Sequence, residues 1–321
     1  YPYKGTAIVG TVSGTSVSYG TEVVFDAGVA SYMDITFDST SNRVVIVYRD
    51  GNNSSYGTAI VGLVDPSDNS ISFGTPVVYY SGSSLFNTCT FDSTNNRIVV
   101  THRTYVGGSS TGVAIVGTVD NSDNSISFGT PVVFNNHDSQ HQFSTFDSSN
   151  GKVVIAFQDG QNVSGVGRGN AIVGNVDPSD NSISFGSKVD FSGAINANYG
   201  TPITFDSNSN KIVVVYQKTT DSNKGYAKVG TVSGTSISFG SETAFESGSF
   251  LVYKAITFDS SVNKVVIVYD YTETDLKYVV GTVSSTSISF GTAVVFSTGN
   301  GTADGSIDVT FDSSNNKSVI V

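Results

Sequence analysis

The sequence has no tryptophan, one cysteine, one methionine and three histidines among its 321 residues, and only 13% of the residues are charged. The single cysteine, Cys89, excludes an internal disulfide and any zinc site built from several cysteines. No apolar run approaches the length of a transmembrane helix and no basic-then-apolar leader precedes Tyr1, so we expect neither membrane insertion nor a signal peptide. Because the first residue is not methionine, we expect an excerpt or a processed product of a longer chain.

Basic residues are also few, since 16 Lys and Arg face 27 Asp and Glu and leave a net charge of −11. A chain that repels phosphate lacks the counterion-release term that supports nucleic-acid binding, so we expect neither nucleic acid nor an anionic membrane as a partner. The abundance of Ser, Thr, Asn and Gly with little Lys is typical of exported or virion surfaces. With 20 Phe, 16 Tyr and 38% hydrophobic residues, the chain has enough apolar surface for a packed core.

What the sequence does contain is an internal repeat. The tetrapeptide Thr-Phe-Asp-Ser occurs six times, at spacings of 53 to 59 residues, with its phenylalanine at Phe37, Phe91, Phe146, Phe205, Phe258 and Phe311. Each copy is followed by Asn or Gly and then Lys or Arg, which predicts a hairpin turn capped by the aspartate. A β-branched run, a Val-Gly element and an Ile-Ser-Phe-Gly segment or a variant of it complete the unit.

Each unit predicts four short strands, exemplified by residues 35–38, 43–49, 58–64 and 71–79, and no segment has helical periodicity. Four-stranded units of about 50 residues are typical of a β-propeller. We therefore predict an all-β fold, a six-bladed propeller of four-stranded antiparallel blades in one domain, 1–321. The first five blades are expected at about 33–80, 87–135, 142–192, 201–246 and 254–297. The sixth combines 307–321 with 3–26, so that strands from both ends of the chain close the ring.

The repeats also separate a uniform face from a variable one. The turns between the first and second strands are nearly identical, whereas the loops after the second strand and the crossings between units differ in length and composition. Loops that differ on a rigid frame are where binding specificity is normally placed, although unconstrained drift gives the same pattern.

Four rings occupy one position of these crossings, five residues before the repeated phenylalanine: Tyr32, Phe86, His141 and Tyr253. Rings beside planar polar groups suit sugars, and Arg49 and Arg103 end the second strands of the first two units. Asp34 and Asp308 stand at matching places before the first strand and complete the candidate ligand-binding set. A second group of rings ends the second strand, at Tyr48, His102, Phe157, Tyr216 and Tyr269, and we interpret it as sealing the blades.

Several patterns invite more specific chemistry. The six repeated aspartates, and pairs such as Asp65 and Asp68, resemble calcium ligands, but turn capping explains them with fewer assumptions. The segment from His137 to His141 has the pattern His-Asp-x-x-His, yet no helix places its ends on one side, so we predict no metal site and no cofactor. Arg49, Arg103 and Arg168, which lie outside the hairpins, also admit a carboxylate-binding interpretation. We expect Cys89 to be buried, as a packing residue.

Three segments define the repeat unit: Gly-Thr-Ala-Ile-Val-Gly, Ser-Ile-Ser-Phe-Gly-Thr-Pro-Val-Val and Thr-Phe-Asp-Ser. This unit resembles repeats of tail-fibre and surface proteins of marine phages and bacteria. The segment 67–76 also resembles a degenerate Asp-box of sialidase-like propellers. It departs from that motif at Ser70, where the box has glycine, and at Phe73, where the box has tryptophan, and a Phe-Arg-Ile-Pro segment is absent. These departures weaken the implied sialidase activity.

We therefore expect a non-enzymatic recognition or adhesion propeller that binds a glycan or a cell-surface receptor through its variable face. The resemblance implies an extracellular or virion-surface location within a fibre, with neighbouring domains or subunits. A glycoside-processing enzyme and a structural spacer of a fibre are the alternatives.

Overall fold

The computed structural model describes residues 3–160, 167–194, 200–248, 253–271, 275–299 and 307–321. The chain divides into two compact units: Tyr1–His137 with Asn175–Ser184, and Asp138–Gly174 with Phe185–Val321. The described residues contain strands and one short 3₁₀ turn, η1 (Thr219–Asp221). In this part of the chain no helix is long and apolar enough to cross a membrane.

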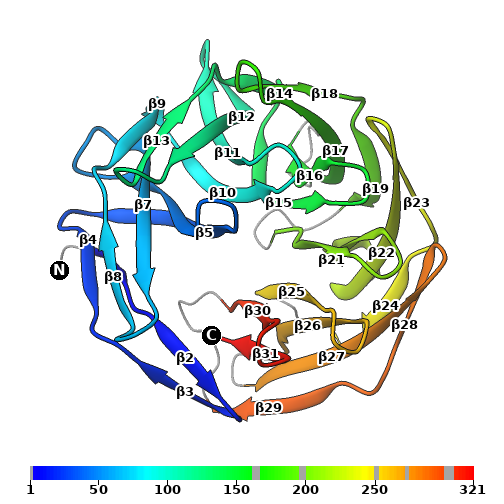
Figure 1. Ribbon diagram of the computed structural model, residues 1–321. Helices are drawn as coiled ribbons and strands as arrows, with labels where there is room; N and C mark the ends of the chain where they lie inside the picture. Colours follow the sequence, from blue (N-terminus) through cyan, green and yellow to red (C-terminus); the bar gives the residue numbers. More distant parts are fainter. Residues whose placement is uncertain (1–2, 161–166, 195–199, 249–252, 272–274, 300–306) are drawn as a thin grey trace. The chain divides into compact units, whose positions relative to one another are not determined.

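The first unit contains two five-stranded antiparallel sheets, which we number sheets 1 and 2 (Figure 1). Sheet 1 consists of β5 (Ala30–Asp38), β6 (Arg43–Asp50), β7 (Tyr56–Asp65), β8 (Ser70–Phe73) and β9 (Val77–Ser83). Sheet 2 consists of β10 (Leu85–Asp92), β11 (Arg97–Val106), β12 (Ser109–Asp120), β13 (Ser125–Phe128) and β14 (Val132–Asn135). Two hairpin-like pairs precede them, β1 (Gly5–Ala7) with β4 (Val23–Asp26) and β2 (Gly10–Ser13) with β3 (Ser16–Tyr19).

Three further sheets repeat this strand order along the rest of the chain. Sheet 3 consists of β15 (Ser139–Asp147), β16 (Lys152–Asp159), β17 (Arg168–Asp177), β18 (Ser182–Phe185) and β19 (Val189–Ala194). Sheet 4 consists of β20 (Ile203–Asp206), β21 (Lys211–Lys218), β22 (Lys224–Ser233), β23 (Ser236–Phe239) and β24 (Thr243–Glu246). Sheet 5 consists of β25 (Lys254–Asp259), β26 (Lys264–Asp270), β27 (Asp275–Ser284), β28 (Ser287–Phe290) and β29 (Val294–Thr298), and the pair β30 (Val309–Asp312) and β31 (Lys317–Ile320) follows.

The strand predicted at 71–79 was wrong as a single element, because it is broken into β8 and β9. Both strands pair with β7, β8 along its last four residues and β9 along its first four. The break falls at Gly74, whose N–H donates to the carbonyl of Val61 at 2.9 Å. A Cβ on Gly74 would lie 2.0 Å from the carbonyl oxygen of Asn124 in sheet 2. The backbone of sheet 1 therefore lies in close contact with sheet 2 at the point where the strand pairing is interrupted.

The predicted turn caps are confirmed. Asp38 Oδ1 accepts hydrogen bonds from the N–H groups of Thr40 and Ser41, at 2.9 and 3.1 Å, and the same pattern recurs in the other hairpins. The residue before each hairpin Lys or Arg has a left-handed backbone, as with Asn42 at φ 55°. Asp65 and Asp68 cap turns in the same way, through the N–H groups of Ser67 and Ser70.

The hairpin arginines of sheets 1 and 2 form no ion pair with these aspartates in the described residues. Arg43 instead reaches from sheet 1 to sheet 2, where its Nε donates to Asn124 Oδ1 and its Nη2 to the carbonyl of Asn121 at 2.8 Å. Arg97 makes the corresponding bonds to Asn181 and to the carbonyl of Pro178. These side chains therefore join neighbouring sheets on the face of uniform turns.

The core lies between successive sheets, because the second strand of each unit is apolar on both faces. In β6, Val45 and Val47 pack against sheet 2, whereas Ile46 and Tyr48 pack on the opposite side with β1 and β4 residues. Strand-end rings complete each interface. The five rings that were predicted to seal the blades are at most 1% exposed, which confirms that role: Tyr48, His102, Phe157, Tyr216 and Tyr269.

These buried rings belong to a repeated aromatic cluster. In sheets 4 and 5 the ring centroids of Phe245 and Tyr269 are 5.3 Å apart, and those of Phe245 and Phe290 are 5.9 Å apart. Phe191, Tyr216 and Phe239 repeat the arrangement between sheets 3 and 4, as do Phe25, Tyr48 and Phe73 in the first unit. The packing of one phenylalanine or tyrosine between two rings of the next sheet thus recurs along the chain.

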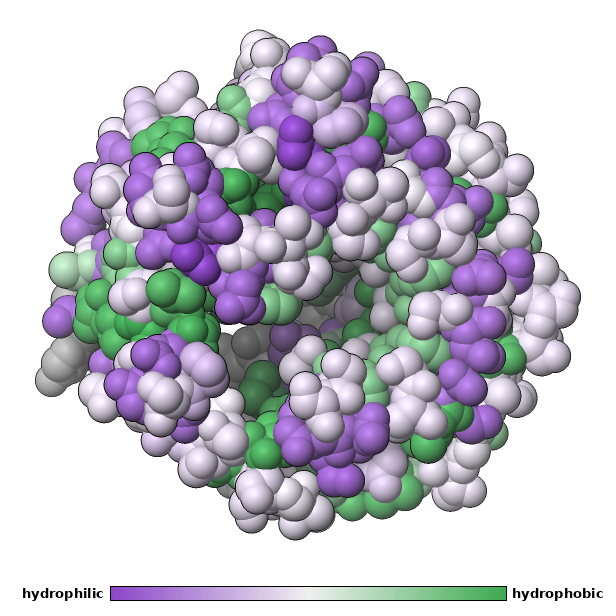
Figure 2. All heavy atoms as spheres, viewed as in Figure 1, coloured by the Kyte–Doolittle hydropathy of each residue, from purple (hydrophilic) through white to green (hydrophobic). Residues whose placement is uncertain are grey.

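The repeated phenylalanines are less buried than their regular spacing implies. Phe205 is half-buried against the cluster between sheets 3 and 4, and Phe91 and Phe258 occupy the same kind of position. Phe37 is 52% exposed, and Ile35 on the same strand is 56% exposed. Figure 2 shows apolar residues gathered in green over the region of the first unit where β4, β5 and β7 lie. Strand β5 of sheet 1 therefore exposes an apolar face, whereas the corresponding face is covered in other copies of the unit.

Candidate functional site

Three of the four crossing rings lie on a β-bulge: Tyr32, Phe86 and His141. In sheets 1, 2 and 3 the pairing of the first two strands shifts register after Ser31, Leu85 and Gln140. The residue that follows each of these positions has a left-handed backbone, with φ of 51° at Tyr32, 53° at Phe86 and 47° at His141. Bulky non-glycine residues rarely adopt this conformation, and such strain is concentrated at functional sites.

The fourth copy of this position carries glycine, and Gly200 has a φ of 70°. Glycine adopts this backbone at no steric cost. It was therefore the one sequence signal that could have revealed the left-handed position at Tyr32, Phe86 and His141.

The bulge brings two of the predicted rings together in the first unit. The Tyr32 and Phe86 ring centroids are 5.2 Å apart at an interplanar angle of 70°, an edge-to-face contact between sheets 1 and 2. Arg103 lies over both Phe86 and Tyr105, with its guanidinium carbon 5.9 and 5.5 Å from the two ring centroids. We call Tyr32, Phe86, Arg103 and Tyr105 the ring–arginine row. Tyr32 is 41% and Tyr105 54% exposed, so the row is accessible to solvent.

Hydroxyl groups hold both predicted arginines. Arg49 Nη2 donates to Ser55 Oγ at 2.7 Å, and Arg103 Nη2 donates to Ser110 Oγ at 2.9 Å. Ser55 sits in a tight loop, where it and Ser54 both have left-handed backbones. Strand pairing places the arginines beside the bulges, because Arg49 pairs with Ser31 and Arg103 with Leu85.

The two predicted carboxylates have structural partners. Asp34 Oδ1 accepts the N–H of Ile35 at 2.9 Å, and its Oδ2 accepts the N–H of Cys89 in sheet 2 at 2.8 Å. Asp308 Oδ1 accepts the N–H of Val309 at 2.8 Å. Asp34 belongs to the first unit and Asp308 to the second, so a common role in ligand binding stays a prediction. Cys89 itself is buried, as expected.

The remaining two rings have different surroundings. His141 is half-buried in the second unit, and a Cβ built on Gly200 would lie 3.6 Å from its Cβ and 2.7 Å from Phe143 Cε2. Tyr253 packs against the buried cluster of Ala255 and Val268, and its carbonyl accepts the N–H of Asp270 at 3.0 Å. Tyr253 therefore contributes to the core, and it is not part of the ring–arginine row.

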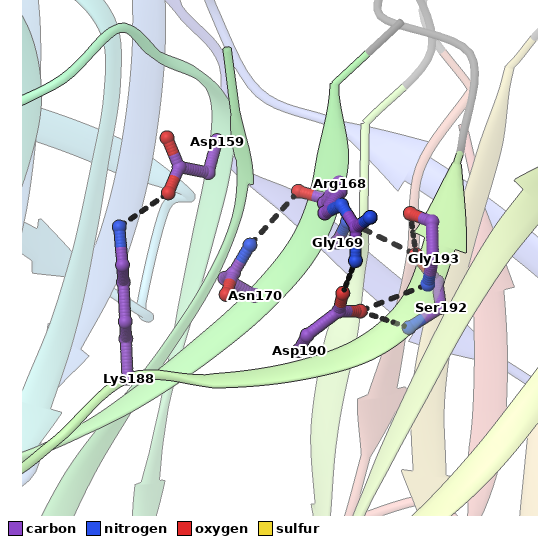
Figure 3. A network of polar contacts seen from close by, with 8 residues as sticks. All are labelled: Asp159, Arg168, Gly169, Asn170, Lys188, Asp190, Ser192 and Gly193. Carbon is purple, nitrogen blue, oxygen red and sulfur yellow. Dashed lines mark hydrogen bonds and ion pairs between the residues drawn. The ribbon is translucent and has the colours of Figure 1, made fainter. Parts of the chain in front are cut away.

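Arg168 was expected to resemble the other two arginines, but its environment differs. It begins β17 and forms an ion pair with Asp190 at 2.7 Å (Figure 3). Asp190 Oδ1 also accepts the N–H groups of Ser192 and Gly193. Partial burial alone would raise the pKa of Asp190, but these N–H groups and the Arg168 guanidinium together lower it. Arg168 is thus committed to a structural network.

A second ion pair, between half-buried Lys188 and buried Asp159, lies close to these residues (Figure 3). Sheet 4 has the charges of this pair exchanged, since Lys218 and Glu242 occupy the corresponding positions and also form an ion pair. The exchange within one chain indicates that the pairing matters more than the identity of either residue.

The histidines form no metal site in the part of the chain that the structure describes, where no group of three His, Cys, Asp or Glu side chains is suitably placed. Asp138, inside the predicted His-Asp-x-x-His segment, accepts a hydrogen bond from Gln140. His102 is fully buried, with ring centroids 5.5 Å from Tyr79 and 4.6 Å from Tyr80, and burial lowers its pKa to about 3.

Comparison with solved structures gives the fold. AofleA from the fungus Arthrobotrys oligospora matches with a TM-score of 0.53 and 8% identity, over 91% of this chain and 78% of AofleA. A substituted variant of AofleA matches with a TM-score of 0.56 over the same shares. A variant of the Aleuria aurantia lectin, solved in complex with Fucα1-6GlcNAc, matches with a TM-score of 0.52 and 10% identity, over 87% of this chain and 84% of the lectin.

The chain shares its fold with a lectin. Its repeated antiparallel sheets are consistent with a β-propeller lectin fold. No protein-family model and no curated protein matches the sequence.

Proposed function

We propose that this protein is a carbohydrate-binding β-propeller and that the ring–arginine row is its binding site. The observation that carries the proposal is the pair of Tyr32, which is 41% exposed, and half-buried Phe86, held edge to face on two strained bulges. Exposed rings gain little for stability, and each left-handed backbone costs on the order of 1 kcal/mol or more. Sugars present an apolar C–H face to such rings and hydroxyl groups to neighbouring arginines. The shared lectin fold supports the same class of ligand.

Glycine substitution tests this proposal, because the chain itself uses Gly200 at the same position. Tyr32→Gly with Phe86→Gly removes both rings and relieves both strained backbones, so the lost packing of half-buried Phe86 is offset and we expect stability to change by no more than about 1 kcal/mol. Binding on a glycan array should fall at least tenfold. Tyr19→Ser, which removes a 61% exposed ring elsewhere in the first unit, is the matched control.

Retention of glycan binding by the folded double glycine variant would contradict the proposal. Release of a shortened sugar by the wild-type protein in the same assay would instead favour a glycoside-processing enzyme. If neither binding nor release occurs, the structural-spacer alternative gains support.

We further propose that the site serves adhesion, as part of an extracellular or virion-surface fibre that binds a cell-surface receptor. The low charged fraction and the phage and bacterial repeat resemblance support this setting. Adhesion of fluorescently labelled protein to intact cells, competed by the glycan found on the array, measures it. Binding that the free glycan does not compete would point to a protein receptor.

A six-bladed ring closed by 307–321 and 3–26 also remains our proposal. Two observations within the separate units support it. Ile35 is 56% exposed, whereas its counterparts Cys89, Ile203, Ile256 and Val309 are 5 to 9% exposed. In addition, a Cβ on the glycine that precedes the last strand of a unit would lie within 2.2 Å of a backbone carbonyl oxygen in the next sheet's turn, as at Gly20, Gly74, Gly129, Gly186 and Gly240. A Cβ on Gly291 would meet no atom within 3.8 Å. Both features mark an edge that a further neighbour would cover.

Closure is tested by Gly291→Ala, with Gly74→Ala as the reference. Gly74→Ala should destabilise the protein by about 1–3 kcal/mol, since the added methyl group cannot avoid Asn124. If the ring closes, Gly291→Ala should cost a similar amount in urea unfolding of a monomer. A change within about 0.5 kcal/mol would mean that Gly291 stays uncovered, and closure would be wrong.

A further inference from the structure

The arginines beside the rings differ from their counterparts in the other copies. Arg49 and Arg103 end the second strands of sheets 1 and 2, whereas Gln158, Gln217 and Asp270 stand at the same position in sheets 3, 4 and 5. A cation at this position is therefore not required by the fold. It occurs only in the two sheets that carry the Tyr32–Phe86 contact.

Arg49 retains most of its capacity to donate hydrogen bonds. Its single hydrogen bond within the described residues goes to the uncharged hydroxyl of Ser55, and a guanidinium carries five N–H donors. It has no ion pair with a carboxylate in this part of the chain. The Arg49 side chain is half-buried and tethered by Ser55, so it loses little conformational freedom when an acceptor binds.

The acidic groups next to these arginines are occupied by backbone N–H groups. Asp50, which follows Arg49, accepts the N–H groups of Asn52 and Asn53 at 3.0 Å. Asp34 accepts the N–H groups of Ile35 and Cys89. These hydrogen bonds hold the two carboxylates in place, and neither forms an ion pair with Arg49 in the described residues.

We propose that the ring–arginine row, together with Arg49, selects glycans that carry an anionic substituent, a carboxylate or a sulfate ester. This inference rests on the proposed carbohydrate binding and specifies its ligand class. Tyr32 and Phe86 contact the C–H face of the sugar, and the guanidinium groups bind the anion. Guanidinium groups match the planar oxygen pairs of carboxylates and the oxygen triads of sulfates, and charge-assisted hydrogen bonds are about twice as strong as neutral ones.

The test compares wild-type protein with Arg49→Gln/Arg103→Gln, which copies the residues of sheets 3 and 4. Both proteins are applied to an array of neutral, carboxylated and sulfated oligosaccharides, including oligogalacturonate beside its uncharged methyl ester. We expect wild-type binding to favour anionic members, and the double Gln variant to lose at least tenfold in affinity for them. Binding of the wild type should also weaken between 50 and 300 mM salt, while melting temperatures of the two proteins agree.

The outcomes separate this inference from the proposed function. Wild-type binding to neutral glycans alone, lost in the double glycine variant of Tyr32 and Phe86, would overturn the anionic preference and leave carbohydrate binding intact. Undiminished binding of anionic glycans by the double Gln variant would overturn it as well. Preference for the oligogalacturonate over its ester would identify carboxylate as the recognised anion, and binding confined to sulfated members would identify sulfate.

Discussion

His102 offers the sharpest test of how the strand-end rings are packed. The imidazole is fully buried between Tyr79 and Tyr80, and neither ring nitrogen has a hydrogen-bond partner in the described residues. Burial without a charge partner lowers its pKa from 6.5 to about 3. The corresponding residue of sheet 3 is Phe157, so His102→Phe removes the titrating group and keeps a ring that the fold already accommodates.

The pH dependence follows from the two pKa values. The unfolded chain binds a proton at His102 below about pH 6.5, while the folded protein does not until about pH 3, so stability falls as the pH is lowered through this window. Between pH 7 and pH 5 the loss is about 2 kcal/mol, because one pKa unit corresponds to about 1.4 kcal/mol. For a chain of this size the loss lowers the melting temperature by roughly 3 °C. Above pH 7 this contribution disappears.

The assay is urea unfolding at pH 7 and pH 5, followed by tyrosine fluorescence or circular dichroism, since the chain has no tryptophan. His102→Phe should lose about 2 kcal/mol less than wild type over this interval, while the carboxylates titrate equally in both proteins. At pH 7 the variant should be as stable as wild type or more so, because two unpaired nitrogens are removed. His102→Leu controls for ring size. Equal pH dependence in wild type and both variants would refute the neutral, buried imidazole.

Four further substitutions test the core and the charged groups. Lys254 is buried with its pKa lowered to about 7, so wild-type stability should rise from pH 7 to pH 10 and Lys254→Met should abolish that rise, as measured by thermal melting across the range. Asp159→Lys or Lys188→Asp alone should lower the free energy of unfolding in urea by about 3 kcal/mol or more, because each leaves two like charges side by side. The double variant restores an ion pair and should regain most of this stability. If it does not, the two positions require these particular residues and not only opposite charges. Phe205→Ala should cost about 2 kcal/mol, less than for a fully buried phenylalanine, and a loss above about 4 kcal/mol would contradict its half-buried position.

Local chemistry in the sequence determined much of the fold. The aspartate caps, the left-handed Asn or Gly of each hairpin and the doubly buried second strands were all predicted correctly, because each depends on a few adjacent residues. The sealing role of Tyr48 and its counterparts followed from the same alternation of facing along the strand. Repetition strengthened these inferences, since the same local pattern occurs in every copy.

The sequence predicted only part of the candidate site. The spacing from the repeated phenylalanine singled out Tyr32 and Phe86, but it grouped them with Tyr253, which packs in the core. The one sign in the sequence of a left-handed backbone at Tyr32 and Phe86 was the glycine at the same position of the fourth copy, Gly200. Whether such a residue projects outward or packs depends on the register of two strands and on the residues of the neighbouring sheet.

Tertiary structure alone decided the contacts between sheets. Arg43 binds Asn124, 81 residues away, and not the aspartate of its own hairpin. At Gly74, where the strand is interrupted, a carbonyl of the next sheet occupies the space that a Cβ would need. The sequence specifies which groups can donate, accept or fill space within a few residues. It does not specify which distant group will lie opposite, because that depends on the separation and twist of sheets whose packing is set by all their residues together.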